Sequence, residues 1–337
     1  MKRIRGQSKF FKKIHLGKMY LLVNFFLYFL VIVDSVYSQH SAEFKIDESE
    51  QLFNLVTKIK GYRIVNQNGK TTQVVSIGSG FFFEFDFGLN KKMTCLVTNK
   101  HVVENCDFGD FELNSMNNDG SPNYGDILKI RLKNYKKLWL YHPSEDLAIL
   151  PITPLLNLIA QNYKRKVYLR KLIESYIPNE QKLNELTAIE DVFMIGYPKG
   201  FSDSINNIPI LRRGTTATPV FINYNKKPQF LLDISIYAGS SGSPILIYNP
   251  ISYVDKKTNS TMFGKRFYFL GIAVESREYE AKGTAISKNG SQIIETRTWL
   301  PFGIAIGIKS SELLIMKKYI ESRTTDSYIE LYKSSLN

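Results

Sequence analysis

The chain has 337 residues, of which 44% are hydrophobic and 22% charged, so it contains enough apolar material for a sizeable core in one large or two small domains. That composition excludes a main body that is intrinsically disordered. The formal net charge of +13 comes from scattered lysines and arginines rather than from a basic stripe interleaved with stacking aromatics, so the charge does not predict nucleic-acid binding.

Residues 1–38 have the pattern of an export signal. Seven basic residues precede the mostly apolar run 19–33, and Asp34 is the only acid in the segment. The run is short for a membrane span and typical of a signal peptide, and Val36-Tyr37-Ser38 offers small or β-branched side chains for cleavage after the serine. We expect an exported protein, secreted or periplasmic, with an uncleaved membrane anchor at 19–33 as the alternative. Residues 39–46 read as a short linker.

The next segments predict one helix followed by many short strands. Residues 47–60 place apolar side chains on one face behind an acidic start, which indicates an amphipathic helix. From residue 62 onward, short β runs alternate with polar and glycine-containing turns, as in an all-β barrel or sandwich. The predicted strands cover residues 63–65, 73–77, 80–87, 94–98, 127–132, 137–141 and 146–152.

Cys95 and Cys106 are the only cysteines, and both lie in the part of the chain predicted to be exported. In an oxidising compartment they can pair, and the small loop that they would close is worth about 2–3 kcal/mol on the chain-entropy account. The sequence leaves a disulfide and two free thiols equally open. Neither cysteine has the Cys-x-x-Cys or His-x-x-x-His spacing of a zinc site, so we expect no bound metal.

A basic connector that looks helical, over residues 154–177, leads to a second β set. Two polar loops, 249–265 and 276–298, interrupt this set, and a closing helix is expected over 310–322. Two β halves joined by a linker indicate two barrels packed together. The predicted strands of the second half cover residues 191–195, 208–220, 229–236, 244–247, 266–275 and 303–308.

The turn Gly239-Ser240-Ser241-Gly242-Ser243-Pro244 lies between two apolar, strand-like runs. A tight turn of this kind can expose one serine hydroxyl and point consecutive N–H groups into a single hollow. Acyl transfer needs both features, a nucleophilic oxygen and donors for the oxyanion that it creates. Taken alone, however, a cluster of glycines and serines is more often an ordinary loop.

A serine nucleophile needs a general base, and histidine is the natural candidate. The part of the chain predicted to be exported contains His40 at its new terminus, His142 before a proline in a turn, and His101 just after the predicted strand 94–98. The base also needs an acid to orient it, and Asp146 heads an apolar strand where its carboxylate requires a donor. Each residue alone has a structural explanation, so only the combination favours catalysis.

With these residues the sequence resembles the trypsin-like, chymotrypsin-fold serine peptidases, and in particular their bacterial HtrA/Deg type. The resemblance runs from about residue 60 to residue 310. The motifs that carry it are Thr98-Asn99-Lys100-His101-Val102-Val103, Asp146-Leu147-Ala148-Ile149 and Gly239-Ser240-Ser241-Gly242-Ser243-Pro244, with Gly78-Ser79-Gly80-Phe81 and Gly196-Tyr197-Pro198 as further matches.

The resemblance implies an all-β fold of two six-stranded antiparallel β-barrels packed together, with a few peripheral helices. The implied peptidase domain covers about 45–310. Within it, the first barrel takes about 60–152, the linker 153–190 and the second barrel about 191–310, and a C-terminal helix and tail follow at 311–337.

The resemblance also implies a serine endopeptidase that acts on protein or peptide substrates without a cofactor. It assigns Ser241 as nucleophile, His101 as general base and then acid, and Asp146 as the residue that orients His101. The backbone N–H groups of Gly239 and Ser241 are implied to form the oxyanion hole.

Departures from the family pattern limit what carries over. Ser240 stands where zymogen-activated members have an aspartate, so Arg63-Ile64-Val65 is not expected to be an activation cleavage site. Ser243 replaces a glycine, which bacterial relatives tolerate. The stretch after Ile308 is too short for a PDZ domain, so the peptide sensing of HtrA proteins is not implied.

Substrate preference is less readable. In the family register Ser235 and Ile236 fall near the base of the S1 pocket, and neither is charged. A preference for arginine or lysine at P1 is therefore not expected, and a small or apolar P1 residue is the working hypothesis. Asp233 lies two residues nearer the N-terminus and is expected to be structural.

Two other functions fit parts of the pattern. A non-catalytic protein-binding module on the same fold is the main alternative, because fold does not fix function. An esterase of the nucleophile-elbow type is disfavoured, because the catalytic residues here run in the order His, Asp, Ser rather than Ser, Asp, His.

Overall fold

The computed structural model describes residues 48–336, except 68, 287–292 and 323–324. The predicted export signal, the linker after it and His40 lie outside the described residues. Within the described part of the chain, no helix is both long enough and apolar enough to cross a membrane.

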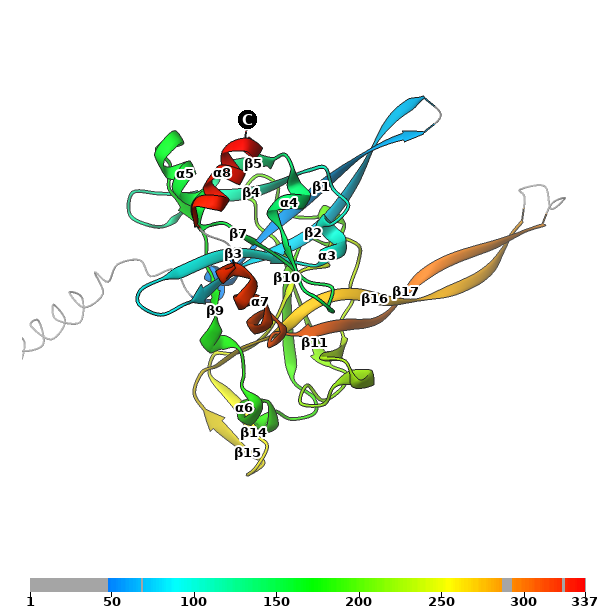
Figure 1. Ribbon diagram of the computed structural model, residues 1–337. Helices are drawn as coiled ribbons and strands as arrows, with labels where there is room; N and C mark the ends of the chain where they lie inside the picture. The colour runs from blue at the N-terminus through cyan, green and yellow to red at the C-terminus, as the bar shows by residue number, and fades with distance from the viewer. Residues whose placement is uncertain (1–47, 68, 287–292, 323–324, 337) are drawn as a thin grey trace, which may run out of the picture. The chain divides into compact units, whose positions relative to one another are not determined.

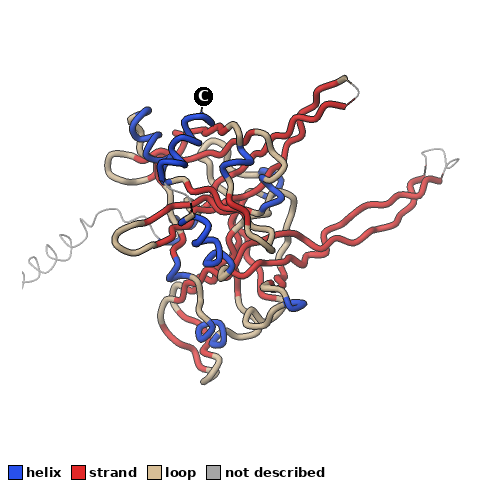
Figure 2. Tube along the Cα trace, in the orientation of Figure 1, coloured by secondary structure: helices blue, strands red, loops and turns tan. Residues whose placement is uncertain are grey.

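Nine strands from the first half of the chain form one sheet, the first β body (Figures 1 and 2). They are β1 (Val56–Gln67), β2 (Lys70–Asp86), β3 (Lys92–Thr98), β4 (Phe108–Met116), β5 (Pro122–Leu132), β6 (Leu140–Tyr141), β7 (Ala148–Pro151), β8 (Val167–Tyr168) and β9 (Leu172–Ile173). Seven of them run in the order β5-β4-β1-β2-β3-β7-β6, while β8 pairs with β4 and β9 with β2. Only the pairing of β2 with β9 is parallel.

Six strands from the second half close into an antiparallel barrel, the second β body. They are β10 (Asp191–Gly196), β11 (Ile210–Thr216), β12 (Gln229–Asp233), β13 (Pro244–Asn249), β16 (Arg266–Ile286) and β17 (Ile293–Lys309). The order around the barrel is β10-β11-β12-β17-β16-β13. Beyond the barrel wall, β16 and β17 stay paired and extend as a long two-stranded arm (Figure 1).

A separate hairpin and several short helices complete the described chain. The hairpin joins β14 (Ser252–Asp255) and β15 (Ser260–Phe263). Single 3₁₀ turns occupy Glu174–Tyr176, Pro198–Gly200 and Tyr224–Lys226. The helices are α2 (Glu48–Leu52), α3 (Lys100–Val103), α4 (Tyr135–Leu138), α5 (Thr153–Tyr163), α6 (Glu180–Glu185), α7 (Glu312–Glu321) and α8 (Thr325–Leu336).

The predicted architecture of two β bodies with a few peripheral helices is confirmed, and a shared apolar core joins the two bodies. Phe81 and Phe83 of β2 enter this core from the first body, and Phe269 of β16 enters it from the second. The rings of Phe81 and Phe269 meet edge to face at 5.2 Å between centroids. Burying each such ring contributes about 2–3 kcal/mol. The first body differs in detail from the expected barrel, since short edge strands bring it to nine strands.

The helix predicted over residues 47–60 is wrong beyond its first turns. α2 ends at Leu52, and Val56 already pairs with Phe81 as the first residue of β1. β-branched residues at positions 56, 57 and 59 fit a pleated strand better than a helix, and continuous pairing with β2 overrides the helical spacing of the apolar residues.

Three further predictions need correction. The connector at 154–177 is α-helical only in α5, after which β8 and β9 extend the first sheet and a single 3₁₀ turn follows. Strand β4 was not predicted. The polar loops at 249–265 and 276–298 are largely paired strand, because they contain the β14–β15 hairpin and the arm of β16 and β17.

Cys95 and Cys106 are both free thiols, so the disulfide that the sequence left open does not form. The Cys95 side chain belongs to the core shared by the two bodies, whereas Cys106 belongs to the core inside the first body. The two sulfur atoms therefore lie in different apolar environments and do not meet. Burial raises the pKa of both thiols, which makes them poor nucleophiles.

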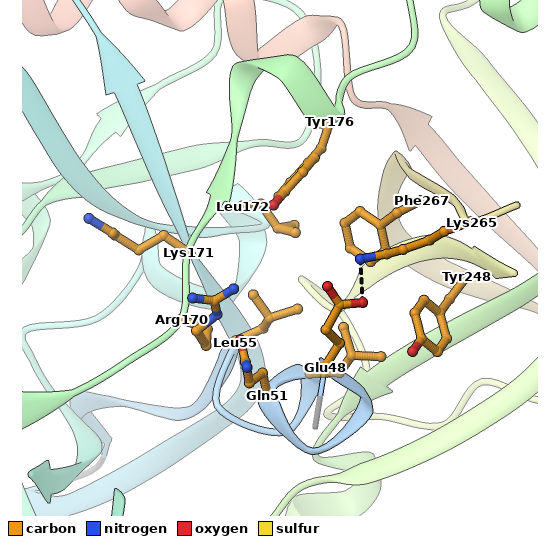
Figure 3. Close-up of a pocket in the computed structure, with 11 residues that line it drawn as sticks. Glu48, Gln51, Leu55, Arg170, Lys171, Leu172, Tyr176, Tyr248, Lys265 and Phe267 are labelled. Atoms are coloured by element: carbon orange, nitrogen blue, oxygen red, sulfur yellow. Dashed lines mark ion pairs between the residues drawn. The ribbon is translucent and has the colours of Figure 1, made fainter. Parts of the chain in front are cut away.

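A shallow hollow lies where α2 approaches the start of β16 (Figure 3). Its wall mixes apolar and charged side chains, and two of its lysines are paired, Lys265 with Glu48 and Lys171 with Glu84. None of the residues predicted for the catalytic site lines it.

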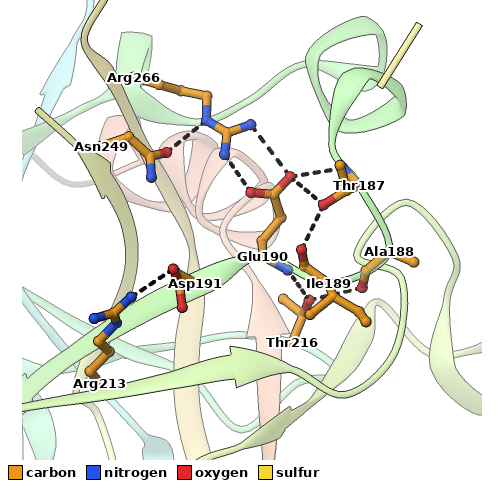
Figure 4. Close-up of polar contacts among 9 residues, drawn as sticks. All are labelled: Thr187, Ala188, Ile189, Glu190, Asp191, Arg213, Thr216, Asn249 and Arg266. Atoms are coloured by element: carbon orange, nitrogen blue, oxygen red, sulfur yellow. Dashed lines mark hydrogen bonds and ion pairs between the residues drawn. The ribbon is translucent and has the colours of Figure 1, made fainter. Parts of the chain in front are cut away.

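A buried ion pair between Glu190 and Arg266 braces the second body where β10 and β16 begin (Figure 4). The guanidinium contacts both carboxylate oxygens, and its Nε donates to Oδ1 of Asn249 at 2.9 Å. Oε1 of Glu190 also accepts from the backbone N and from Oγ1 of Thr187, at 2.8 and 2.9 Å. Less than a tenth of either charged side chain is exposed, so the loss of one partner would leave an unpaired buried charge.

We predict that Glu190→Ala lowers the free energy of unfolding by about 3–5 kcal/mol, because it strands the buried charge of Arg266. Asp191→Ala is the matched control. It breaks the neighbouring pair with Arg213, whose side chains are largely exposed, and should leave the unfolding midpoint nearly unchanged. Urea unfolding followed by circular dichroism compares the two, and equal losses would contradict the bracing role of the buried pair.

Candidate active site

His101 and Asp146 meet at the end of β3. His101 is the second residue of α3, which begins directly after β3, and Asp146 stands just before β7, the antiparallel neighbour of β3. Nδ1 of His101 lies 2.6 Å from Oδ2 of Asp146, and the backbone N–H of His101 donates to Oδ1 at 3.0 Å. Nδ2 of Asn99 donates to the Asp146 carbonyl at 2.8 Å. Both carboxylate oxygens of Asp146 thus contact His101, one at its ring and one at its backbone.

The charge state of this pair suits a base and its orienting acid. Burial by itself raises the pKa of Asp146, but the hydrogen bonds and charge of His101 outweigh it, so the pKa lies below its ordinary value. About a third of the Asp146 side chain and nearly half of the His101 side chain are exposed. An ionised carboxylate against Nδ1 keeps the proton on that nitrogen and leaves Nε2 as the proton acceptor.

Ser241 lies in the turn between β12 and β13, which two glycines shape. Gly239 and Gly242 have φ values of +91° and +87°, in the region that L side chains avoid. A Cβ at position 242 would also lie 2.0 Å from the carbonyl oxygen of Ser79. Only glycine therefore allows the turn to approach the first body this closely.

Two hydrogen bonds behind the turn orient the N–H groups of Gly239 and Ser241. The carbonyl of Ala238 accepts from the Lys199 N–H at 2.5 Å, and the carbonyl of Ser240 accepts from the backbone N–H three residues later at 3.0 Å. In a trans peptide the C=O and N–H point in opposite directions. The N–H groups of Gly239 and Ser241 are therefore turned away from these two anchors.

Ser79 of β2 holds this turn from the first body. Its N–H donates to the Ser241 carbonyl at 2.8 Å, and its Oγ donates to the Gly239 carbonyl at 2.8 Å. The same Oγ accepts from the Tyr197 N–H at 2.9 Å, while the Ser79 carbonyl accepts from Oγ1 of Thr98 at 2.7 Å. Thr98 is the last residue of β3. Ser79, which is fully buried, thus ties the serine turn to the strand end from which α3 starts.

The Ser241 hydroxyl has a partner of its own in the second body. Its Oγ donates to the carbonyl of Val274 on β16 at 2.7 Å. A hydroxyl has a single proton to donate. Transfer of that proton to an imidazole nitrogen therefore requires the O–H bond to turn away from Val274.

The structure places the other residues from the sequence analysis as follows. Ile236 is buried in the core of the second body, Ser235 is half-buried beside it, and Asp233 is exposed at the end of β12. The segment 63–65 lies in the middle of β1, paired along its length with β2, so a cut there would sever a strand. His142 is buried beside α7.

Sequence reasoning missed the roles of Ser79, Lys199 and Val274. Lys199 and Val274 act through backbone atoms, which any residue could supply, so no side-chain pattern marks them. Ser79 did carry a signal, because a serine between two glycines can lie where two backbones approach closely.

A model of the trypsin-like peptidase domain matches residues 78–248, just over half of the chain. This chain belongs to that family. The matched segment contains His101, Asp146 and Ser241. Membership in the trypsin-like peptidases agrees with the two β bodies and with the placement of the site at their junction.

Solved structures similar to this trypsin-like chain include a thermostable serine protease, AL20, from an extremophilic microorganism, and the inactivated protease paralogue S-I1 of the scabies mite. The first has 10% sequence identity and a TM-score of 0.40, and the match covers 81% of this chain and 99% of that one. The second has 12% identity and a TM-score of 0.36, with coverage of 81% and 98%. Comparison with curated proteins finds no match.

We predict that Ser79→Ala destabilises the junction, because it removes the acceptor of the Tyr197 N–H and the donor to the Gly239 carbonyl. Each buried group left unsatisfied costs about 1–3 kcal/mol. Ser260→Ala, at an exposed serine of β15, is the control and should behave as wild type. Chemical unfolding measures both variants, and equal stability would show that the Ser79 hydroxyl does not hold the turn.

Proposed function

We propose that this protein is an exported serine endopeptidase that cleaves peptide bonds with Ser241, His101 and Asp146. Membership in the trypsin-like peptidase family supports a hydrolase. The observation that carries the assignment is the 2.6 Å contact between His101 and Asp146, held at the same junction as the turn of Ser241. The export component rests on the sequence pattern of residues 1–38.

In the proposed reaction, Oγ of Ser241 attacks the carbonyl carbon of the scissile peptide while its proton passes to Nε2 of His101. For this the hydroxyl first turns away from Val274. The N–H groups of Gly239 and Ser241 stabilise the resulting oxyanion. His101 then gives the proton to the departing amine, which leaves an acyl group on Ser241. Water, activated by the same imidazole, hydrolyses this acyl-enzyme.

Asp146 acts in this scheme by remaining ionised. Its lowered pKa keeps the carboxylate charged at neutral pH, and that charge stabilises the imidazolium that forms when His101 takes the proton. The backbone N–H of His101 also donates to the carboxylate, so Asp146 positions His101 through one bond to its ring and one to its backbone.

The proposed substrate is a protein or peptide with a small or apolar P1 residue. Ser235 and Ile236, which the family register places near the pocket base, supply no charge that would bind arginine or lysine. A cleavage profile on a mixed peptide library tests this, and cutting after basic residues would overturn the P1 proposal while leaving the proposed chemistry intact.

We predict that Ser241→Ala abolishes hydrolysis of casein, with a loss on the order of 10⁶ in kcat, because the nucleophile is absent. The same change should abolish covalent labelling by a fluorophosphonate probe.

Ser243→Ala is the matched control for this experiment. The Oγ of Ser243 is buried and has no hydrogen-bond partner among the described residues, so its loss should leave labelling unchanged. Labelling of Ser241→Ala would contradict the assignment of the nucleophile. If the folded wild-type protein is neither labelled nor active, the non-catalytic binding module becomes the better reading.

We predict that Asp146→Asn lowers kcat by roughly 10⁴, because the amide no longer stabilises the imidazolium and favours the wrong tautomer of His101. Circular dichroism should show that the variant is folded. A loss of less than tenfold in steady-state hydrolysis would show that Asp146 does not orient the base.

A further inference from the structure

His142 closes the turn that carries Asp146. Its Nδ1 lies 2.9 Å from the backbone nitrogen of Glu145 and 3.3 Å from that of Ser144, and both N–H groups donate to it. The backbone of His142 also closes this turn, because its N–H donates to the Leu147 carbonyl at 2.9 Å. One side chain thus satisfies two of the N–H groups that precede Asp146, and it is almost fully buried.

These contacts require a particular form of the imidazole. A nitrogen that accepts two N–H groups carries no proton, so the ring of His142 is neutral with its proton on Nε2. Nε2 lies 3.5 Å from Oε2 of Glu312, at the start of α7. Protonation of Nδ1 would place an N–H donor against two other donors, and the turn could not keep its present form.

The charges around His142 come from its own turn and from α7. Glu145 lies on the turn, and its carboxylate accepts from Gln229 on β12 at 3.0 Å. Glu312 and Lys318 lie on α7. Burial lowers the pKa of His142, Glu145 raises it and Lys318 lowers it, and the net result is below the ordinary value. The neutral form therefore prevails at neutral pH.

We propose that His142 is a positioning residue for Asp146, whose neutral imidazole holds the turn 142–146 so that the Asp146 carboxylate meets His101. The inference rests on the proposed function for its consequence in catalysis, but its structural part stands independently. The carboxylate of Asp146 is held by His101 and by the backbone of Lys100, and its carbonyl by Asn99, while the turn before it adds a constraint on its backbone.

The proposal gives the molecule a second acid-sensitive group besides His101. The pKa of His142 is lower in the folded protein than in the unfolded chain, so below about pH 6.5 the unfolded chain binds more protons. Folding stability is therefore complete above that pH and falls as the pH drops toward the folded pKa. The turn loosens over the same range, and Asp146 loses its position.

Two substitutions distinguish the role of Nδ1 of His142 as a hydrogen-bond acceptor from the role of its ring volume in packing. In His142→Asn, Oδ1 takes the place of Nδ1 and accepts the same N–H groups, but it does not titrate. In His142→Phe, the ring volume is kept and the acceptor is lost. We expect His142→Phe to lower kcat by roughly tenfold to a hundredfold with little change in KM, since a displacement of about 1 Å in a catalytic constellation costs this much. We expect His142→Asn to rescue kcat at pH 8.

The pH profile gives a readout that a merely structural residue would not move. The acid limb of log kcat/KM should fall with a slope near two in the wild type, because His101 and His142 both take up protons, and with a slope near one in His142→Asn. The unfolding midpoint should also drop more between pH 7.5 and pH 5.5 in the wild type than in His142→Asn. Equal slopes and equal midpoint drops would overturn the proposal.

A measurement on the resting protein keeps this inference separate from the proposed function. The Nδ1 proton of His101, in its short bond to Asp146, should give a strongly deshielded ¹H NMR signal in the wild type and in His142→Asn, but not in His142→Phe. If the wild type and His142→Asn show this signal and His142→Phe does not, but the wild type does not hydrolyse peptides, the proposed function fails and the positioning role stands. If hydrolysis is present and all three proteins share the signal and the pH profile, the positioning role fails alone.

Discussion

The hydrogen bonds of Ser79 are the interaction on which the candidate site depends. Aromatic side chains from the two β bodies pack against each other in the shared core. Apolar contact is not directional, however, so it does not fix the position of a turn to a fraction of an ångström. Ser79 adds that direction, because it reaches the Gly239 and Ser241 carbonyls on one side and Thr98 on the other. Since its backbone and side chain are both engaged while the residue is fully buried, each bond is stronger than it would be in water.

Two acid–base pairs show how exposure separates a structural role from a functional one. Glu190 and Arg266 are buried and bonded to each other and to neighbouring side chains, so they hold strand ends together and have little access to solvent. His101 and Asp146 have equally close contact but remain partly open to solvent. An imidazole in that position is accessible to a substrate and to water, which a general base must be.

The sequence pointed to particular residues for the candidate site, while it left much of the detail of the fold unpredicted. His101, Asp146 and Ser241 stand in motifs whose residue types the chemistry itself demands, so their places at strand ends were recognisable. β4 escaped notice because buried Asn114 and Ser115 break its apolar alternation. The arm of β16 and β17 was not predicted because its described side chains are largely exposed on both faces. The sequence therefore lacks the alternation of apolar and polar residues that marks a half-buried strand. His142 was set aside as a residue in a proline turn, since only the fold reveals what its ring accepts.

The four segments that build the site are far apart along the chain and belong to different bodies. Residues 79, 101 and 146 come from the first body, and residue 241 comes from the second. A copy in which only one body has folded therefore possesses a serine without a base, or a base without a serine. On the proposed chemistry, such an immature or damaged copy cannot digest its neighbours. On the proposed chemistry, activity therefore depends on the folding and docking of both bodies.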